Sequence, residues 1–304
     1  MKKFLFMFLI VLLLVSSCNQ EDNVEISKGP FVGGSNGLSL SFVEGAPSTE
    51  FLQGENVPVK LFLKNNGEYD LGADLIETRL YGVHMSSFSL NSDWTIIGSV
   101  INGIQKGIDE EGVERIVDIG QINYVPNVDG FVESTLFAKI CYPYQTRASI
   151  DICVNSKEIE DSGVESVCEI TGEKIKSGSV SSGPIQITSF TETFESRDGL
   201  NFKIKLENKG TGNVYVPEII CSELGVASDI LKEDKIYIIF PEDITCFFLD
   251  GEESNEGYVK IGETSLSCHL DVENTGSNYR RIIELFVDYK YIESTSIDLS
   301  ILEA

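Results

Sequence analysis

The stretch KLFLKNNG, residues 60–67, recurs later in the chain as KIKLENKG, residues 203–210. In each copy apolar and polar residues alternate and then run into Asn-x-Gly. Alternation with a period of two is typical of a half-buried strand, and Asn and Gly accept the positive φ of a turn. Each copy is therefore predicted to be a strand followed by a turn, within an internal repeat.

A second correspondence lies downstream of each copy, where IDICVN at 150–155 matches IELFVD at 283–288. The two segments are predicted to be the closing strands of two repeated units. Between the units lies SGSVSSGP, residues 177–184, which is rich in residues that do not build strands. This segment is predicted to be the linker.

The rest of the chain consists of short alternating runs separated by Gly, Pro, Asn and Asp, and helical periodicity is nearly absent. Many short strands without a βαβ rhythm predict an all-β protein, built as two antiparallel immunoglobulin-like β-sandwiches in tandem. The first domain is expected at 37–176 and the second at 185–304. The first carries an extra region around 81–129, which contains Trp94 and where a specific function is expected.

The N-terminus has the layout of an export signal: Met1-Lys2-Lys3, an apolar run, and then Ser16-Ser17-Cys18. The apolar run from Phe4 to Val15 makes a helix of about 18 Å, short of the roughly 30 Å hydrocarbon core. Residues 15–18, VSSC, resemble the lipobox of prokaryotic lipoproteins, which implies that residues 1–17 are a signal peptide and that Cys18 is lipidated. Residues 18–36 are then expected to be a tether, because the acidic stretch after Cys18 is too polar to fold.

The net charge of the chain limits the classes of partner that it can bind. The chain carries 23 Lys and Arg against 48 Asp and Glu, a net charge of −25. Such a surface repels phosphate backbones and anionic headgroups, so nucleic acid is not expected as a partner. Acidity of this size also serves solubility or adaptation to salt.

Seven cysteines divide into Cys18 and six others: Cys141, Cys153, Cys168, Cys221, Cys246 and Cys268. An even set in an exported chain predicts disulfides. Three of the six lie in each predicted unit, so at least one bridge must join the two units or two thiols stay free. Cys153 is predicted to pair with Cys168, and a zinc site is disfavoured because no CxxC occurs and the chain has 2 His.

The repeated strand resembles the opening strands of CARDB-like and related immunoglobulin-type domains of prokaryotic surface proteins. The run CYPYQTRA at 141–148, continuing to Cys153 and Cys168, and GPIQIT at 183–188 are similar to tandem β-sandwich surface proteins of small-genome archaea. The resemblance covers most of residues 37–302. It implies an exported, disulfide-bearing protein with a structural or binding role and no assigned catalytic residue.

The sequence gives only weak signals for ligand-binding residues. Trp94, Tyr142 and Tyr144 could form an aromatic patch, although aromatic residues on strands more often pack in a core. Asp250, Glu252 and Glu253 offer the oxygen ligands that calcium prefers, without EF-hand spacing, and a solvated hairpin tip is the alternative. No other cofactor is expected, because no P-loop, H-E-x-x-H or dinucleotide fingerprint is present.

These features favour a non-enzymatic surface lipoprotein, anchored to the cell membrane through Cys18, that acts in adhesion, envelope structure or surface assembly. Its expected partners are other surface proteins or glycans. One alternative is a lipoprotein that captures a glycan or peptide with the 81–129 region. A second alternative is an extracytoplasmic hydrolase built on the acidic loops.

Overall fold

The computed structural model describes residues 29–109, 111–154, 167–196, 199–224, 231–262, 265–272 and 279–304. The predicted signal peptide, Cys18 and the first part of the expected tether lie outside these residues. Within them the protein is all-β, as predicted, with two single 3-10 turns, η1 (Met85–Phe88) and η2 (Cys221–Glu223). Over the same ranges no helix has the length and apolar content needed to cross a membrane.

The strands form three sheets. One has the order β1 (Leu38–Phe42), β3 (Val57–Asn65), β6 (Glu114–Ile122). A six-stranded sheet has the order β14 (Glu253–Ser254), β13 (Ile244–Phe247), β16 (Leu266–Asp271), β10 (Gly199–Asn208), β9 (Ile185–Ser196), β8 (Gly172–Glu173). The largest sheet has the order β15 (Glu256–Lys260), β12 (Lys235–Ile239), β17 (Tyr279–Leu302), β7 (Phe131–Val154), β4 (Ile76–Tyr81), β5 (Thr95–Ile97), and β2 (Glu50–Leu52) and β11 (Asn213–Tyr215) also pair with β17.

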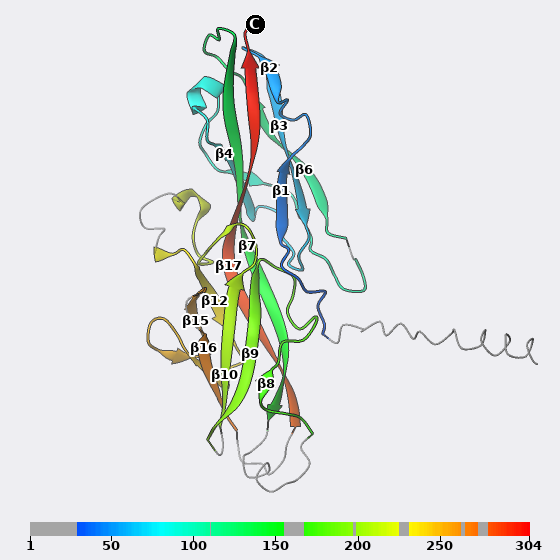
Figure 1. The fold of residues 1–304 in the computed structure, drawn as a ribbon, viewed down its shortest axis with the longest axis vertical. Coiled ribbons are helices and arrows are strands. Elements are labelled where there is room, and N and C mark those ends of the chain that lie inside the picture. Colours follow the sequence, from blue (N-terminus) through cyan, green and yellow to red (C-terminus); the bar gives the residue numbers. More distant parts are fainter. Residues whose placement is uncertain are drawn as a thin grey trace, which may run out of the picture.

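Two strands of 24 residues each, β7 and β17, run the length of the molecule (Figure 1). They pair antiparallel without a register shift from Phe131 opposite Leu302 to Val154 opposite Tyr279. At about 3.3 Å per residue this ribbon is about 80 Å long. We call the paired strands the ribbon.

The other two sheets pack on opposite ends of the ribbon and make two lobes (Figure 1). The first lobe has the three-stranded sheet and encloses a core with Val59, Leu61, Leu136 and Ile301. The second lobe has the six-stranded sheet, whose Phe190 and Phe202 belong to a larger core that continues up the ribbon. The two predicted units therefore share one continuous sheet.

The strand pairings relate the lobes by an approximate two-fold operation. In the first lobe β4 pairs with residues 137–141 of β7, and in the second lobe β12 pairs with residues 286–288 of β17. The predicted repeat of 60–67 and 203–210 is present, since these segments end β3 and β10 at equivalent places. The second correspondence is wrong in register: residues 283–288 are equivalent to positions near 137–141, and not to 150–155.

Two predicted segments are placed differently from expectation, and a third forms strands. Residues 177–184, predicted as a linker, are buried between the lobes, with Ser181 and Ser182 exposed by 1% and 2%. Residues 29–36 of the predicted tether dock there, where the Phe31 N–H donates to the Gly178 carbonyl at 3.0 Å. The region 81–129 contributes β5 and β6 to two of the sheets, because β6 pairs with β3 as β16 pairs with β10.

Candidate functional site

The predicted aromatic residues Tyr142 and Tyr144 lie at the centre of the ribbon, where they are 0% and 2% exposed. With Tyr289 and Tyr291 on β17 they form a buried group that we call the tyrosine quartet. Tyr142 lies opposite Tyr291, and Tyr144 lies opposite Tyr289. Ring centroids of neighbouring members are 5.8 to 6.2 Å apart. The quartet is therefore core packing between the lobes, and Tyr142 and Tyr144 form no exposed ligand patch.

Two Asn-x-Gly turns dock on the quartet in the same way. The Asn65 side chain accepts the Gly67 N–H at 3.1 Å and donates to the Tyr69 carbonyl at 2.8 Å. Its repeat, Asn208, accepts the Gly210 N–H at 3.1 Å and donates to the Gly212 carbonyl at 2.8 Å. These matched bonds explain why the repeat ends in Asn-x-Gly.

Each turn then meets a tyrosine hydroxyl. The Gly212 N–H donates to the Tyr291 hydroxyl at 2.8 Å, and the Tyr144 hydroxyl, beside Gly67, donates to the Ser182 carbonyl at 3.3 Å. Burial raises the pKa of Tyr291 to about 12, so the hydroxyl stays protonated. A β-carbon on Gly67 would lie 1.7 Å from the Tyr144 hydroxyl, so the approach requires glycine.

Glu68 is 7% exposed, and its carboxylate holds segment 29–37 against the buried region between the two lobes, which we call the waist. It accepts the backbone N–H groups of Val32 at 2.8 Å, Gly33 at 3.0 Å and Ser182 at 2.7 Å. Lys106 adds bonds from its Nζ to two carbonyls of the same segment, at 2.6 and 2.9 Å. Segment 29–37 is thus held by charge-assisted hydrogen bonds.

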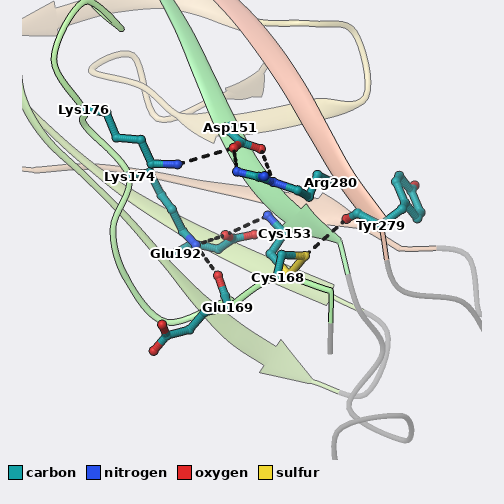
Figure 2. Close-up of a disulfide and its surroundings, with 9 residues drawn as sticks. All are labelled: Asp151, Cys153, Cys168, Glu169, Lys174, Lys176, Glu192, Tyr279 and Arg280. Atoms are coloured by element: carbon teal, nitrogen blue, oxygen red, sulfur yellow. Dashed lines mark hydrogen bonds and ion pairs between the residues drawn. A yellow bond between two sulfur atoms is a disulfide. The ribbon is translucent and has the colours of Figure 1, made fainter. Parts of the chain in front are cut away.

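A cleft of about 440 Å³ opens in the second lobe beside the docked segment. It is lined by Gly29, Pro30, Ser149, Asp151, Lys174, Lys176, Ser179, Arg280 and Ile282. Figure 2 shows Lys176 and Arg280 both reaching Asp151. The Arg280 guanidinium bonds the Asp151 carboxylate through Nε at 3.2 Å and through Nη2, and Lys176 Nζ lies 3.4 Å from the same group. Two cations on one carboxylate leave the cleft positive in an acidic chain.

Below the cleft lies a buried ion pair. Lys174 Nζ is 2.9 Å from Glu192, and their side chains are 9% and 0% exposed. Glu192 also accepts the Cys153 N–H at 3.1 Å, and Lys174 donates to the Glu169 carbonyl at 2.5 Å (Figure 2). Desolvation raises the pKa of Glu192, and the hydrogen bond from Lys174 opposes that rise.

All six cysteines among the described residues form disulfides. The predicted pair Cys153–Cys168 is confirmed, and it lies next to Glu192 (Figure 2). Cys141–Cys221 joins the two predicted units, as the counting argument allowed, and Cys246–Cys268 links β13 to β16. Three bridges indicate a chain that folds in an oxidising, extracytoplasmic compartment.

Of the remaining predicted residues, Trp94 is half-buried, and Asp250, Glu252 and Glu253 are exposed. Trp94 precedes β5, and the Arg79 guanidinium lies 5.7 Å from its ring centroid. Asp250 accepts the Glu252 N–H at 3.0 Å within a hairpin, and Glu253 begins β14. In the described part of the chain no group of three His, Cys, Asp or Glu side chains is spaced to hold a metal ion, so calcium at this hairpin stays a prediction.

The cleft residues were not predicted from the sequence. Lys174 and Lys176 form a basic pair in a chain with twice as many acids, which is a usable signal. Asp151 and Arg280 carry no such signal, because only the pairing of β7 with β17 brings them together.

No protein-family model matches the chain, and no curated protein matches it. Among solved structures the chain is similar to the C-terminal globular domain of an oligosaccharyltransferase from Pyrococcus abyssi, at 9% identity and a TM-score of 0.22. The match covers 88% of this chain and 50% of that one, so it spans half of that domain. We draw neither a fold nor a function from a match at this TM-score, and the CARDB-like resemblance stays a prediction.

Proposed function

We propose that the chain is a non-enzymatic surface lipoprotein, anchored to the cell membrane through Cys18, whose body acts as a rigid element in envelope structure or surface assembly. The observation that carries the proposal is the ribbon, which crosses both lobes without a register shift. A continuous sheet with a buried waist resists bending between the lobes. Independent domains on an exposed linker would not provide this stiffness.

The place of attachment supports a structural role. Ten residues, 19–28, separate Cys18 from Gly29, which limits their span to about 40 Å. Gly29 lies against Gly178 and beside the cleft of the second lobe. A body about 80 Å long that is anchored on its flank keeps both lobe ends available to neighbouring surface molecules. This geometry favours assembly in the plane of the envelope over a stalk that adheres by its far end.

Exposed sheet edges provide surfaces for assembly. β6 forms one edge of the three-stranded sheet, and six of its nine residues are exposed, including Ile116 at 63%. Glu114 and Asp118 on that strand, with the positive-φ Gly120, are features that limit uncontrolled edge pairing. An edge protected in this way suits a selective protein partner.

The test has two parts. The Cys18→Ala variant is expected to lose lipid labelling and to leave the membrane fraction, whereas a Ser17→Ala variant keeps both. Cross-linking on native envelopes, from probes placed on β6 and on β15, is then expected to capture other surface proteins at both lobes. Unchanged membrane retention of Cys18→Ala contradicts the anchor, and a chain without cross-linked neighbours contradicts the assembly role.

A second function, ligand capture, is favoured by the cleft at Asp151, Lys176 and Arg280. The cavity is large enough for a small ligand, and its two cations suit an anionic group. Arg280→Gln should weaken capture of such a ligand, measured as retention of the purified chain on an array of acidic glycans. Equal retention by wild type and variant contradicts this function.

A further inference from the structure

Two cations stand side by side on the outer face of the eight-stranded sheet, away from the cleft. Arg79 on β4 is the direct cross-strand partner of Lys139 on β7. Their neighbours along the strands, among them Leu80 and Ala138, point into the core of the first lobe. Alternation along a strand therefore sends the Arg79 and Lys139 side chains to the same outer face.

Aromatic rings hold the two cations in place. The Arg79 guanidinium lies 5.7 Å from the centroid of the Trp94 ring, and Lys139 Nζ lies 4.3 Å from that of Tyr81. Tyr81 in turn packs on Phe137, with ring centroids 5.1 Å apart. Contacts of this kind attract and orient a cation, but they do not neutralise its charge.

This arrangement costs folding free energy. Like charges directly opposite on paired strands repel each other, and partial burial together with Arg79 lowers the pKa of Lys139. Over the described ranges of the chain, neither cation has a carboxylate within salt-bridge distance. Glu77, two positions before Arg79 on the same face of β4, forms no ion pair with either cation, although the chain has 48 acidic residues.

Two polar hydrogens at the same place lack acceptors. The Nε of Arg79 and the Nε1 of Trp94 are buried atoms for which the described residues supply no hydrogen-bond partner. Buried N–H groups in native proteins are almost always bonded, and exceptions call for an explanation. These two unbonded groups leave the Arg79–Trp94 contact incompletely satisfied, and an anionic group bound to the two cations would offset the charge repulsion between Arg79 and Lys139.

We propose that Arg79, Lys139 and Trp94 form a binding site for the carboxylate of a sugar acid within a glycan of low charge density. The guanidinium is a planar donor that matches a carboxylate, and Lys139 adds a second charge. Next to them on β17 lie the exposed Ser294, opposite Lys139, and Ser296, whose hydroxyls suit a sugar ring. The net charge of −25 repels a densely charged polyanion, so the ligand carries isolated charges.

The site goes beyond the proposed structural role and does not depend on it. It also gives the predicted Trp94 a definite part, since the ring positions the arginine.

The test is calorimetric titration of the full-length chain with D-glucuronate, with D-glucose and sodium sulfate as comparison ligands. Glucuronate is expected to bind saturably, and glucose is not. Arg79→Gln and Lys139→Gln should each weaken binding about tenfold, which corresponds to about 1.4 kcal/mol. Arg79→Lys should be intermediate, because it keeps the charge and loses the planar donor. Lys203→Gln, an exposed lysine on β10, is the matched control and should bind as wild type does.

Thermal melting separates a ligand-binding role of Arg79 and Lys139 from a purely structural one, because the two roles predict opposite changes in melting temperature. If the cations serve a ligand, both Gln variants should melt at or above the wild-type temperature without ligand, because the repulsion is relieved. The proposal is overturned if glucuronate binds no better than glucose, or if the Gln variants bind it like wild type. It is also overturned if sulfate alone binds, or if both Gln variants melt several degrees lower.

Discussion

Glu68 offers the sharpest test of how the waist is held together. Its carboxylate accepts three backbone N–H groups, two from the docked N-terminal segment and one from Ser182. Glu68→Ala removes all three acceptor contacts and leaves the donors in a site where the native side chain is 7% exposed. A hydrogen bond to a charged group contributes about 1.5–3 kcal/mol, and such contributions are not additive.

The lower end of that range for each of the three bonds, reduced slightly for non-additivity, gives a loss of about 4 kcal/mol. For a chain of this size the melting temperature then falls by about 8–16 °C. Glu68→Gln keeps one acceptor oxygen and should fall by about half as much. The assay is thermal unfolding followed by circular dichroism, with Glu133→Ala, an exposed carboxylate on β7, as the control. If Glu68→Ala melts within about 2 °C of that control, the proposed fastening of segment 29–37 is refuted.

Three further predictions follow from the same contacts. Gly67→Ala and Gly210→Ala should both destabilise the chain in urea unfolding by more than about 2 kcal/mol, because the added β-carbon would lie 1.7 Å and 2.2 Å from a quartet hydroxyl. Replacing both Cys141 and Cys221 by Ser opens a bridge across 80 positions, with an expected loss of about 4.5 kcal/mol in the loop-entropy relation. Desolvation raises the pKa of Glu192, so its protonation favours the folded state. The difference in unfolding free energy between wild type and Glu192→Gln should therefore favour wild type most below about pH 4.5 and decline as the pH rises. Urea unfolding midpoints from pH 4 to 8 measure this difference.

Each of these three predictions has a control variant or a result that would contradict it. Gly98→Ala should be nearly neutral, since the nearest atom to the added carbon is 3.7 Å away, and equal effects at Gly67 and Gly98 would contradict the packing argument. Opening Cys246–Cys268, which spans 22 positions, should cost less than opening the longer bridge. If the stability of wild type relative to Glu192→Gln instead increases with pH, the pKa of Glu192 is lowered in the folded state and not raised.

The sequence predicts the local elements well. Alternation in 60–67 and 203–210 marks β3 and β10, and their Asn-x-Gly endings mark two turns with the same hydrogen bonds. The short separation of Cys153 and Cys168 was enough to predict that disulfide. These features depend on residues close together in the chain, where pattern and turn chemistry act directly.

The joining of the lobes could not be predicted in the same way. Alternation continues through β7 and β17 but does not show which neighbours lie along each half of a 24-residue strand. The segment 177–184 has the composition of a linker, yet it is buried because its backbone bonds to the ribbon, as in the Ser181 N–H bond to the Arg147 carbonyl. The Arg79–Lys139 pair likewise exists only through the register of β4 on β7.

The central claim is that the two lobes form one rigid body through the ribbon, and native-state hydrogen exchange measured by mass spectrometry tests it most directly. Peptides that cover the tyrosine quartet, residues 140–146 and 287–293, should exchange as slowly as the cores of both lobes and only through global unfolding. Exchange at the quartet much faster than in either core would show a hinge between independent domains and would contradict the claim.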